Sequence, residues 1–302
     1  MGKKNKIDVV GLGQCSLDTI GKIEKYPAAD RKCEVTGMTI QGGGPVATAL
    51  VALSRWQAAC AFMGITGDDP FGAQIRASLS QAGIDISGLK TRPQSGSQVA
   101  FIVAEKGSGR RNIFWQQPVG PPLSAKEIDM DLITHARVFH TDGLFSEAAL
   151  EGATAATAAG VPVVVDAGTL RNGMLELAGK ADFFIASETF SRALIGRDAP
   201  LQACRELSKL GPGLACITLG ARGYTALYNG RIIESPAYPV KAVDTTGCGD
   251  IFHAGFIHGL LNRWTIEKCL DFAAWAAAMI SLKVGGRAGI PRVSDWPGGP
   301  PL

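Results

Sequence analysis

Short apolar runs alternate with amphipathic segments along most of this chain. Several of the apolar runs are nearly continuous, which is typical of strands that are buried on both faces of a parallel sheet. The runs predict strands over residues 7–11, 59–65, 137–141, 161–165, 183–186 and 215–219. The amphipathic segments predict helices over 45–56, 71–82 and 147–159, and two more over 248–264 and 266–283. This alternation predicts an α/β fold with a mostly parallel central sheet flanked by helices.

Two segments, at about 19–40 and 99–115, break the alternation. Both show strand-like alternation with polar turns, and neither is followed by a helix of its own. A hairpin is expected at Lys106-Gly107-Ser108-Gly109. We expect the two segments to form a small β-strand lid that stands off the main sheet; ordinary surface loops are the alternative. Because no linker composition or internal repeat is visible, residues 1–302 are interpreted as a single domain with the lid inserted in it.

The composition excludes several classes of protein. Hydrophobic residues make up 46% and charged residues 19%, which is enough to bury a large core and argues against disorder. The net charge of +3 is small and the basic residues are scattered, so nucleic-acid binding is not expected. No run approaches the about 18 apolar residues that a membrane span needs, and the apolar run after the basic start is too short for a signal peptide.

The cysteines and histidines give no sign of a metal site. The seven cysteines include no CxxC pair, and the four histidines lack metal-ligand spacing. A zinc site is therefore not expected. Reduced thiols in a cytoplasmic protein are the simplest interpretation.

The stretch Asp244-Thr245-Thr246-Gly247-Cys248-Gly249-Asp250 runs directly into an apolar helix. Small residues at a helix start leave backbone N–H groups unpaired, and together with the helix dipole such groups can hold an anion. Asp250 would then lie where a hydroxyl group next to a bound phosphate must lose its proton. The alternative is an ordinary aspartate cap behind a glycine turn.

The same stretch resembles the DTxGAGD signature of the ribokinase-like (PfkB) carbohydrate kinase family, with Cys248 where alanine is usual. Further motifs follow in the order of that family over nearly the whole chain. They are the opening strand with a sugar-binding aspartate at Gly11 to Asp18, the paired glycines at Gly42-Gly43-Gly44, the GDDxxG turn at Gly67 to Gly72 and the TxGxxG nucleotide loop at Thr218 to Gly223. The resemblance implies a ribokinase-like fold and a phosphoryl transfer from ATP, with Mg²⁺, to a hydroxyl of a sugar or sugar-like molecule.

The resemblance also implies roles for single residues. Asp250 would be the catalytic base, and the anion hole would be formed by the amides of Gly247, Cys248 and Gly249. The acceptor would be bound by Asp18, Gly43 and Gly44, and the nucleotide by Thr218, Gly220 and Gly223. Asp244 and Thr246, with the loop 285–289, lie where family members often hold a monovalent cation such as K⁺. By analogy we also expect a homodimer that forms through the lid.

Two departures from the family pattern bear on the substrates. Ala47 stands where the family has an asparagine that contacts the sugar, so one acceptor contact is missing or replaced. In the NxxE motif near the metal–nucleotide site, Ser187 replaces the asparagine and Phe190 the glutamate, which leaves the neighbouring Glu188 as a substitute. A nucleoside kinase and an acidic-sugar or phosphosugar kinase remain alternatives among enzymes. A nucleotide- or sugar-binding regulator is the alternative outside them.

Several further residues have two interpretations. The segment 11–16 imitates GxGxxG but lacks its third glycine, so a dinucleotide site is not expected. His253 could touch substrate or be a structural histidine. The Cys248 thiol could have a lowered pKa and be reactive at the helix start, or be a small buried residue chosen for its volume. The basic lid residues could bind an acidic sugar or form a solvated face: Arg31, Lys106, Arg110 and Arg111.

Overall fold

The computed structural model describes residues 7–106 and 111–298. Their main element is a nine-stranded sheet in the order β13-β12-β11-β10-β9-β8-β1-β4-β5. Seven neighbouring strands are parallel: β1 (Val9–Leu12), β4 (Cys60–Gly67), β5 (Leu89–Arg92), β8 (Val138–Thr141), β9 (Val163–Ala167), β10 (Phe183–Ser187) and β11 (Leu214–Thr218). The predicted α/β fold with a mostly parallel sheet is confirmed, and the expected strands lie within about two residues of the observed ones.

An antiparallel hairpin at one edge of this sheet was not predicted. It consists of β12 (Tyr224–Tyr228) and β13 (Arg231–Ser235), which continue the sheet beyond β11. Asn229 and Gly230 form its turn, with φ angles of 47° and 79°. An Asn-Gly pair between two apolar runs is a strong hairpin signal, because both positions tolerate positive φ. This signal was present in the sequence.

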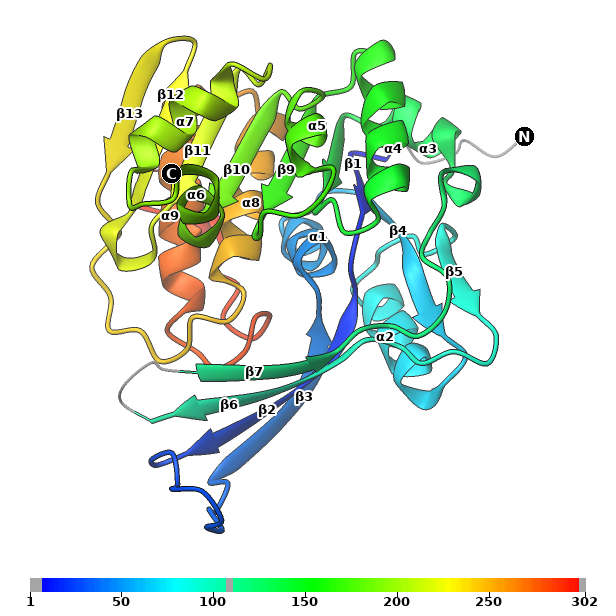
Figure 1. The fold of residues 1–302 in the computed structure, drawn as a ribbon, viewed down its shortest axis with the longest axis vertical. Helices are drawn as coiled ribbons and strands as arrows, with labels where there is room; N and C mark the ends of the chain where they lie inside the picture. Colours follow the sequence, from blue (N-terminus) through cyan, green and yellow to red (C-terminus); the bar gives the residue numbers. More distant parts are fainter. Residues whose placement is uncertain (1–6, 107–110, 299–302) are drawn as a thin grey trace.

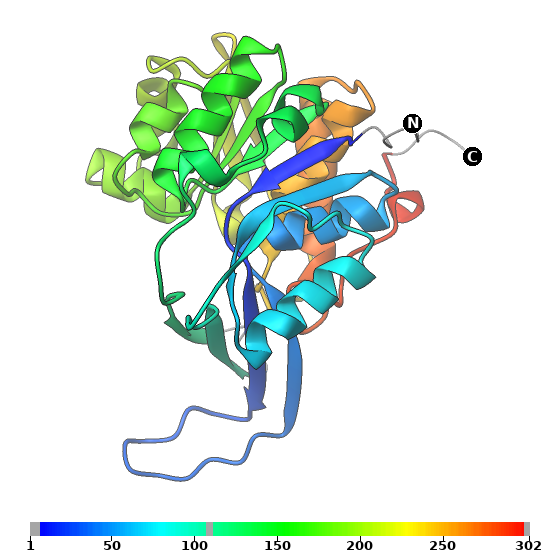
Figure 2. The ribbon, with the colours of Figure 1, turned by 90° about the vertical axis from the view of Figure 1, so that its right-hand side faces the viewer.

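Helices cover both faces of the sheet (Figures 1 and 2). One face packs against α1 (Pro45–Arg55), α2 (Pro70–Gln81), α8 (Cys248–Leu261) and α9 (Ile266–Ile280). The other packs against α3 (Met130–His135), α4 (Ser146–Ala158), α5 (Met174–Ala178), α6 (Glu188–Ile195) and α7 (Pro200–Ser208). Short 3₁₀ turns lie at Ala125–Glu127, Gly220–Arg222 and Val293–Asp295. All residues of β1 and β4 are buried, as near-continuous apolar strands between two helix layers require.

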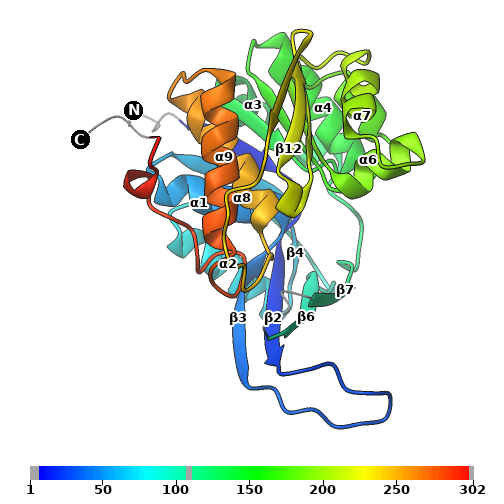
Figure 3. The same cartoon turned by 90° about the vertical axis from the view of Figure 1, so that its left-hand side faces the viewer.

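A separate four-stranded sheet in the order β3-β2-β6-β7 lies at the carboxyl ends of the main strands (Figures 1 and 3). It contains β2 (Ser16–Ile23), β3 (Gly37–Gly43), β6 (Val99–Glu105) and β7 (Arg111–Gln116). These strands fall mainly in the two segments that break the alternation. Residues 107–110, which include most of the expected hairpin and Arg110, lie outside the described residues.

Within the two described ranges, every helix is too short or too polar to cross a lipid bilayer. The longest of them, α9, has 15 residues. A spanning helix needs about 20 apolar residues.

Candidate active site

Four aspartates, Asp18, Asp142, Asp166 and Asp250, lie near enough to one another for the charges of the other three to act on Asp250. Asp18 belongs to β2, Asp142 directly follows β8, Asp166 belongs to β9 and Asp250 lies in the first turn of α8. Burial raises the pKa of Asp250 well above its usual value, and the charges of Asp166 and Asp18 raise it further. Ligands of open α/β sheets bind at the carboxyl ends of the strands, so this edge is the candidate site.

The side chain of Asp250 has no partner among the described residues. The cap of α8 is Gly247, in the left-handed region at φ 80°, and Asp250 follows in the first turn without capping the helix. Its half-buried side chain forms no hydrogen bond to another described residue. A carboxylate that is neither a cap nor an ion-pair partner fits the role of a base better than that of a structural residue.

The start of α8 offers unpaired amides beside Asp250. The N–H of Cys248 donates to the Thr245 carbonyl at 3.3 Å, so this amide is occupied. The amides of Gly247, Gly249 and Asp250 have no backbone acceptor among the described residues. A Cβ on Gly249 would meet no atom within 4 Å, so this end of the helix is open. The amides of Gly247 and Gly249 therefore remain anion-hole candidates, joined by that of Asp250 in place of Cys248.

The guanidinium of Arg111, from the four-stranded sheet, contacts the loop that precedes α8. Arg111, the first residue of β7, donates a hydrogen bond to the Thr245 hydroxyl. Its buried Nε has no partner among the described residues. Arg111 therefore contacts the loop before α8 and is not part of a fully solvated face, and its binding role stays a prediction.

The acceptor side of the site brings Asp18 and the paired glycines together. The Ser16 hydroxyl donates to Asp18 Oδ1 at 2.7 Å, and β2 pairs with β3 so that Gly43 lies opposite Ser16. A Cβ on Gly43 would lie 2.1 Å from Asp18 Oδ2, so only glycine leaves room for this carboxylate. Gly44 has a φ of 92° and starts α1. The geometry thus explains why glycines occupy both positions.

A cavity of about 470 Å³ continues from the start of α8 toward the edge hairpin. Thr218, Gly220 and Gly223 line it, together with Cys248 and Gly249. The remaining walls are largely apolar and include Tyr224, Phe252 and the alanines of α9. Such a pocket can take a flat apolar ring at one end and an anionic group at the other.

The comparisons with known proteins agree with this geometry. The sequence model of the pfkB family carbohydrate kinases matches residues 6–292. The chain belongs to the PfkB family of carbohydrate kinases. It is accordingly a phosphotransferase with an alcohol group as acceptor.

Relatives match this PfkB kinase over almost their whole length. An ATP-dependent ribose-1-phosphate kinase from Halopiger xanaduensis is 25% identical over 284 residues, which are 93% of this chain and 94% of the relative. A ribokinase from Haemophilus influenzae is 27% identical over 291 residues, with the same coverage. The solved structure of Arabidopsis thaliana ribokinase complexed with ribose and ATP has a TM-score of 0.81 and 23% identity, and covers 95% of this chain and 96% of its own. These matches confirm the ribokinase-like fold.

Two further carboxylates at the candidate site are not among the residues that the sequence predicts. Asp142 is 3% exposed and accepts hydrogen bonds from the amides of Gln14 and Leu144 at 2.8 and 2.9 Å. Burial raises its pKa to about 6. Asp166 lies 3.4 Å from Nδ1 of His253. Each lies at or directly after the last residues of a buried strand, and that signal could have identified both residues.

His253 of the PfkB kinase has a structural role. Its Nδ1 lies 2.8 Å from the Gly249 carbonyl and its Nε2 lies 3.3 Å from the Ile185 carbonyl. Both ring nitrogens thus lie next to backbone carbonyls, and only 3% of the residue is exposed. The side chain of His253 therefore links the start of α8 to β10. The structural interpretation of His253 is the one the geometry supports.

The surroundings of the Cys248 thiol favour the second of its two interpretations. Burial raises its pKa to about 12, and the opposing charge of Arg111 is too weak to reverse this. The thiol therefore remains protonated at neutral pH, and it is a poor nucleophile. Cys248 fits the alternative of a small residue packed beside the core.

Ser187 and Glu188 do not line the candidate nucleotide cavity of the kinase. Ser187 caps α6 by accepting from the Phe190 amide, and it pairs in register with Thr218. Glu188 forms ion pairs with Arg192 and Arg222. Arg222 belongs to the predicted nucleotide loop, so Glu188 lies beside that loop, but its carboxylate is already paired. Their nucleotide role stays a prediction.

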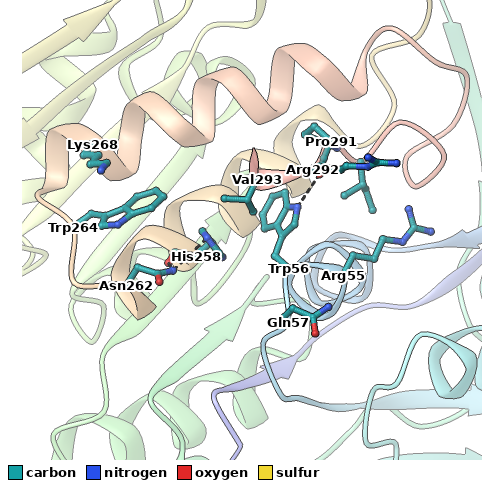
Figure 4. Close-up of a pocket in the computed structure, with 11 residues that line it drawn as sticks. Arg55, Trp56, Gln57, His258, Asn262, Trp264, Lys268, Pro291, Arg292 and Val293 are labelled. Carbon is teal, nitrogen blue, oxygen red and sulfur yellow. Dashed lines mark hydrogen bonds between the residues drawn. The ribbon is translucent and has the colours of Figure 1, made fainter. Parts of the chain in front are cut away.

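A larger cavity, of about 720 Å³, lies apart from these residues of the kinase (Figure 4). It is lined by Trp56, Trp264 and Lys268 and bordered by Arg55 and Arg292. None of the predicted site residues lines it, and it contains no carboxylate. Its size alone does not make it the active site.

Proposed function

We propose that this protein is an ATP-dependent kinase that phosphorylates a hydroxyl of a neutral sugar or sugar-like acceptor, with Asp250 as the base. The observation that carries this proposal is the position of the unpaired Asp250 carboxylate. It lies in the first turn of α8, next to the open amides, and near enough to Asp18 for that charge to raise its pKa. The candidate nucleotide cavity reaches Gly249, one of the residues with an open amide.

In the proposed reaction Asp250 takes the proton of the acceptor hydroxyl as its oxygen attacks the γ-phosphorus of ATP. The bond between this phosphorus and the β–γ bridging oxygen breaks, and ADP leaves. The amides of Gly247 and Gly249 and the guanidinium of Arg111 would hold the charge on the transferred group. Mg²⁺ on the nucleotide would supply further charge and needs few protein ligands.

The charges at the acceptor side favour a neutral acceptor. Asp18, Asp142 and Asp166 are all buried near Asp250. Ionised carboxylates only accept hydrogen bonds, so they suit the hydroxyl groups of a sugar or nucleoside. They would repel a phosphate or carboxylate placed next to them. Arg111 and the similarity to a ribose-1-phosphate kinase favour a phosphosugar as the second candidate.

A screen of acceptors with ATP and Mg²⁺ tests the function. We expect ADP formation with at least one neutral acceptor among D-ribose, D-fructose and adenosine, and less with ribose 1-phosphate or gluconate. ³¹P NMR of the product should show one new phosphate ester. Turnover restricted to the anionic acceptors would refute the neutral class, and no turnover with any acceptor would favour a binding regulator.

We also propose that K⁺ raises the rate, by binding near Asp244 and Thr246. The Asp244 carboxylate is 2% exposed and accepts hydrogen bonds from the amides of Thr246 and Gly285, at 2.9 and 2.8 Å. No cation among the described residues forms an ion pair with it within 4.0 Å. A buried charge without a counter-charge is costly, so a bound cation would stabilise it. At constant ionic strength kcat should be higher in KCl than in N-methylglucamine chloride; equal values would rule the site out.

The oligomer is proposed to form through the four-stranded sheet. This sheet exposes large apolar side chains, among them Met38 at 67%, Phe114 at 58% and Trp115 at 54%. Exposed apolar strands commonly need a covering partner, and a second copy of the chain is the one we propose. Light scattering should give the mass of a dimer, and a Trp115→Lys variant should shift that mass toward the monomer.

The cytoplasm stays the proposed compartment. All seven cysteines are free, and Cys33 is exposed to solvent. Free thiols persist where the environment is reducing. Thiol titration of the protein freshly isolated from cells should therefore find no disulfide.

A further inference from the structure

Arg287 is a buried cation that the mechanism above does not use. It lies in the loop 285–289 after α9, and 6% of the residue is exposed. Its guanidinium donates to the Gly43 carbonyl at 3.1 Å, to the Thr48 hydroxyl at 3.3 Å and to the Ser78 hydroxyl at 3.2 Å. These three acceptors belong to β3, α1 and α2. One side chain thus ties together the elements that position the acceptor glycines.

The backbone of the same loop contacts the anion hole. The Gly285 amide donates to Asp244, and a Cβ on Gly247 would lie 2.6 Å from the Gly286 Cα. On the other side, a Cβ on Gly42 would lie 2.2 Å from Arg287 Nη1. The loop is therefore packed between the start of α8 and the paired glycines. The distance between the base and the acceptor site depends on this loop.

Arg287 also changes the charge of the site. Its positive charge faces Asp18 and Asp250 and lowers the pKa of both, against the effect of burial. No carboxylate among the described residues lies within the 4.0 Å of an ion pair with it. The guanidinium thus acts on both aspartates through space and does not itself occupy their oxygens. Its Nε donates to the hydroxyl of Thr48, which is next to the Ala47 that replaces the family's asparagine.

We propose that Arg287 is a positioning residue for phosphoryl transfer, which fixes the paired glycines to the loop behind the anion hole and holds a positive charge beside Asp18 and Asp250. This role rests on the proposed function, because it presumes that Asp250 acts as the base.

The sign of the pH effect follows from the charges that face Asp250. Asp166, Asp18 and Asp142 raise its pKa, the neutral Cys248 thiol lies beside it, and Arg287 lowers its pKa. Asp250 must be ionised to accept a proton. Without Arg287 its pKa rises, so the acid limb of the kcat/KM profile moves to higher pH. A nearby opposite charge typically shifts a carboxyl pKa by about 1–3 units, and we expect a shift of about one unit or more.

Arg287→Met, Arg287→Lys and Arg55→Met form the test. Arg55 donates to the Arg287 carbonyl at 2.6 Å from α1, and Figure 4 shows it at the border of the larger cavity. Arg55→Met loosens the same loop but keeps the charge of Arg287, so it controls for a structural effect. We expect Arg287→Met to move the acid limb and to raise the acceptor KM by about tenfold or more, with a smaller effect on the ATP KM. Arg287→Lys should restore most of the acid limb, and Arg55→Met should leave it unchanged.

A second readout does not require activity. ¹³C NMR of aspartate-labelled protein, with Asp250→Asn for assignment, measures the carboxyl pKa of Asp250 directly. A higher pKa in Arg287→Met than in wild type and Arg55→Met supports the inference, even if no acceptor is phosphorylated and the proposed function fails. An unchanged pKa in Arg287→Met, or an equal rise in Arg55→Met, overturns the inference whatever the kinase activity.

Discussion

Asp250→Asn will lower kcat by about 10²- to 10⁴-fold, the usual worth of a general base, while ATP still binds. The amide keeps the shape of the side chain but cannot take the proton of the acceptor. The amides of Gly247 and Gly249 are not altered, so the nucleotide phosphates keep their site. Steady-state assays of ADP release give kcat, and calorimetric titration gives the Kd for ATP.

The matched control is Asp295→Asn, which makes the same change on an exposed residue of the 3₁₀ turn Val293–Asp295. It should behave as wild type in both measurements. If Asp250→Asn keeps kcat within about tenfold of wild type, Asp250 is not the base. If it loses ATP binding as well, the residue serves the nucleotide site.

Asp18→Ala will raise the KM for the acceptor by about 10- to 100-fold and leave that for ATP nearly unchanged. A hydrogen bond to a charged group is worth about 1.5–3 kcal/mol, which corresponds to that range. Gly43→Ala should act in the same direction without removing the carboxylate, because its Cβ would lie 2.1 Å from Asp18 Oδ2 and displace it. Initial rates with each substrate varied in turn separate the two KM values.

Gly37→Ala is the matched control on the same strand. Its Cβ would meet only a Lys22 side-chain carbon, at 3.9 Å, so the substitution fits without displacement. Its acceptor KM should equal that of wild type. Equal increases in both KM values for Asp18→Ala would instead assign the residue to folding.

The sequence predicted those parts of the fold and site whose signals are local. Buried parallel strands appear as apolar runs, and Asp250 stands beside the glycines that start its own helix. The sequence signal of the β12–β13 hairpin, the pair Asn229-Gly230, is equally local. The hairpin lies outside the prediction because that prediction follows the alternation of strands and helices.

Contacts between distant segments could not be predicted in this way. In the sequence Arg287 is a basic residue in a glycine-rich loop, a setting typical of a solvated side chain. Its burial depends on Gly42, which lacks the side chain that would exclude it. For Cys248 the local signal is ambiguous, because a helix start can lower the pKa of a thiol. Only the packing of the folded chain shows that burial raises this pKa more than nearby charges lower it.

The bond between Arg287 and Gly43 joins positions 244 residues apart, and this has a consequence for synthesis. A ribosome adds about 5–20 residues per second, so roughly ten to fifty seconds separate the two residues during translation. The four-stranded sheet is complete in sequence once β7 ends at Gln116, and its exposed Phe114 and Trp115 emerge early. Apolar surface that waits for the rest of its chain is prone to aggregation. The growing polypeptide therefore exposes the apolar side chains of the four-stranded sheet long before it can bind a sugar. Chaperones would meet this surface first.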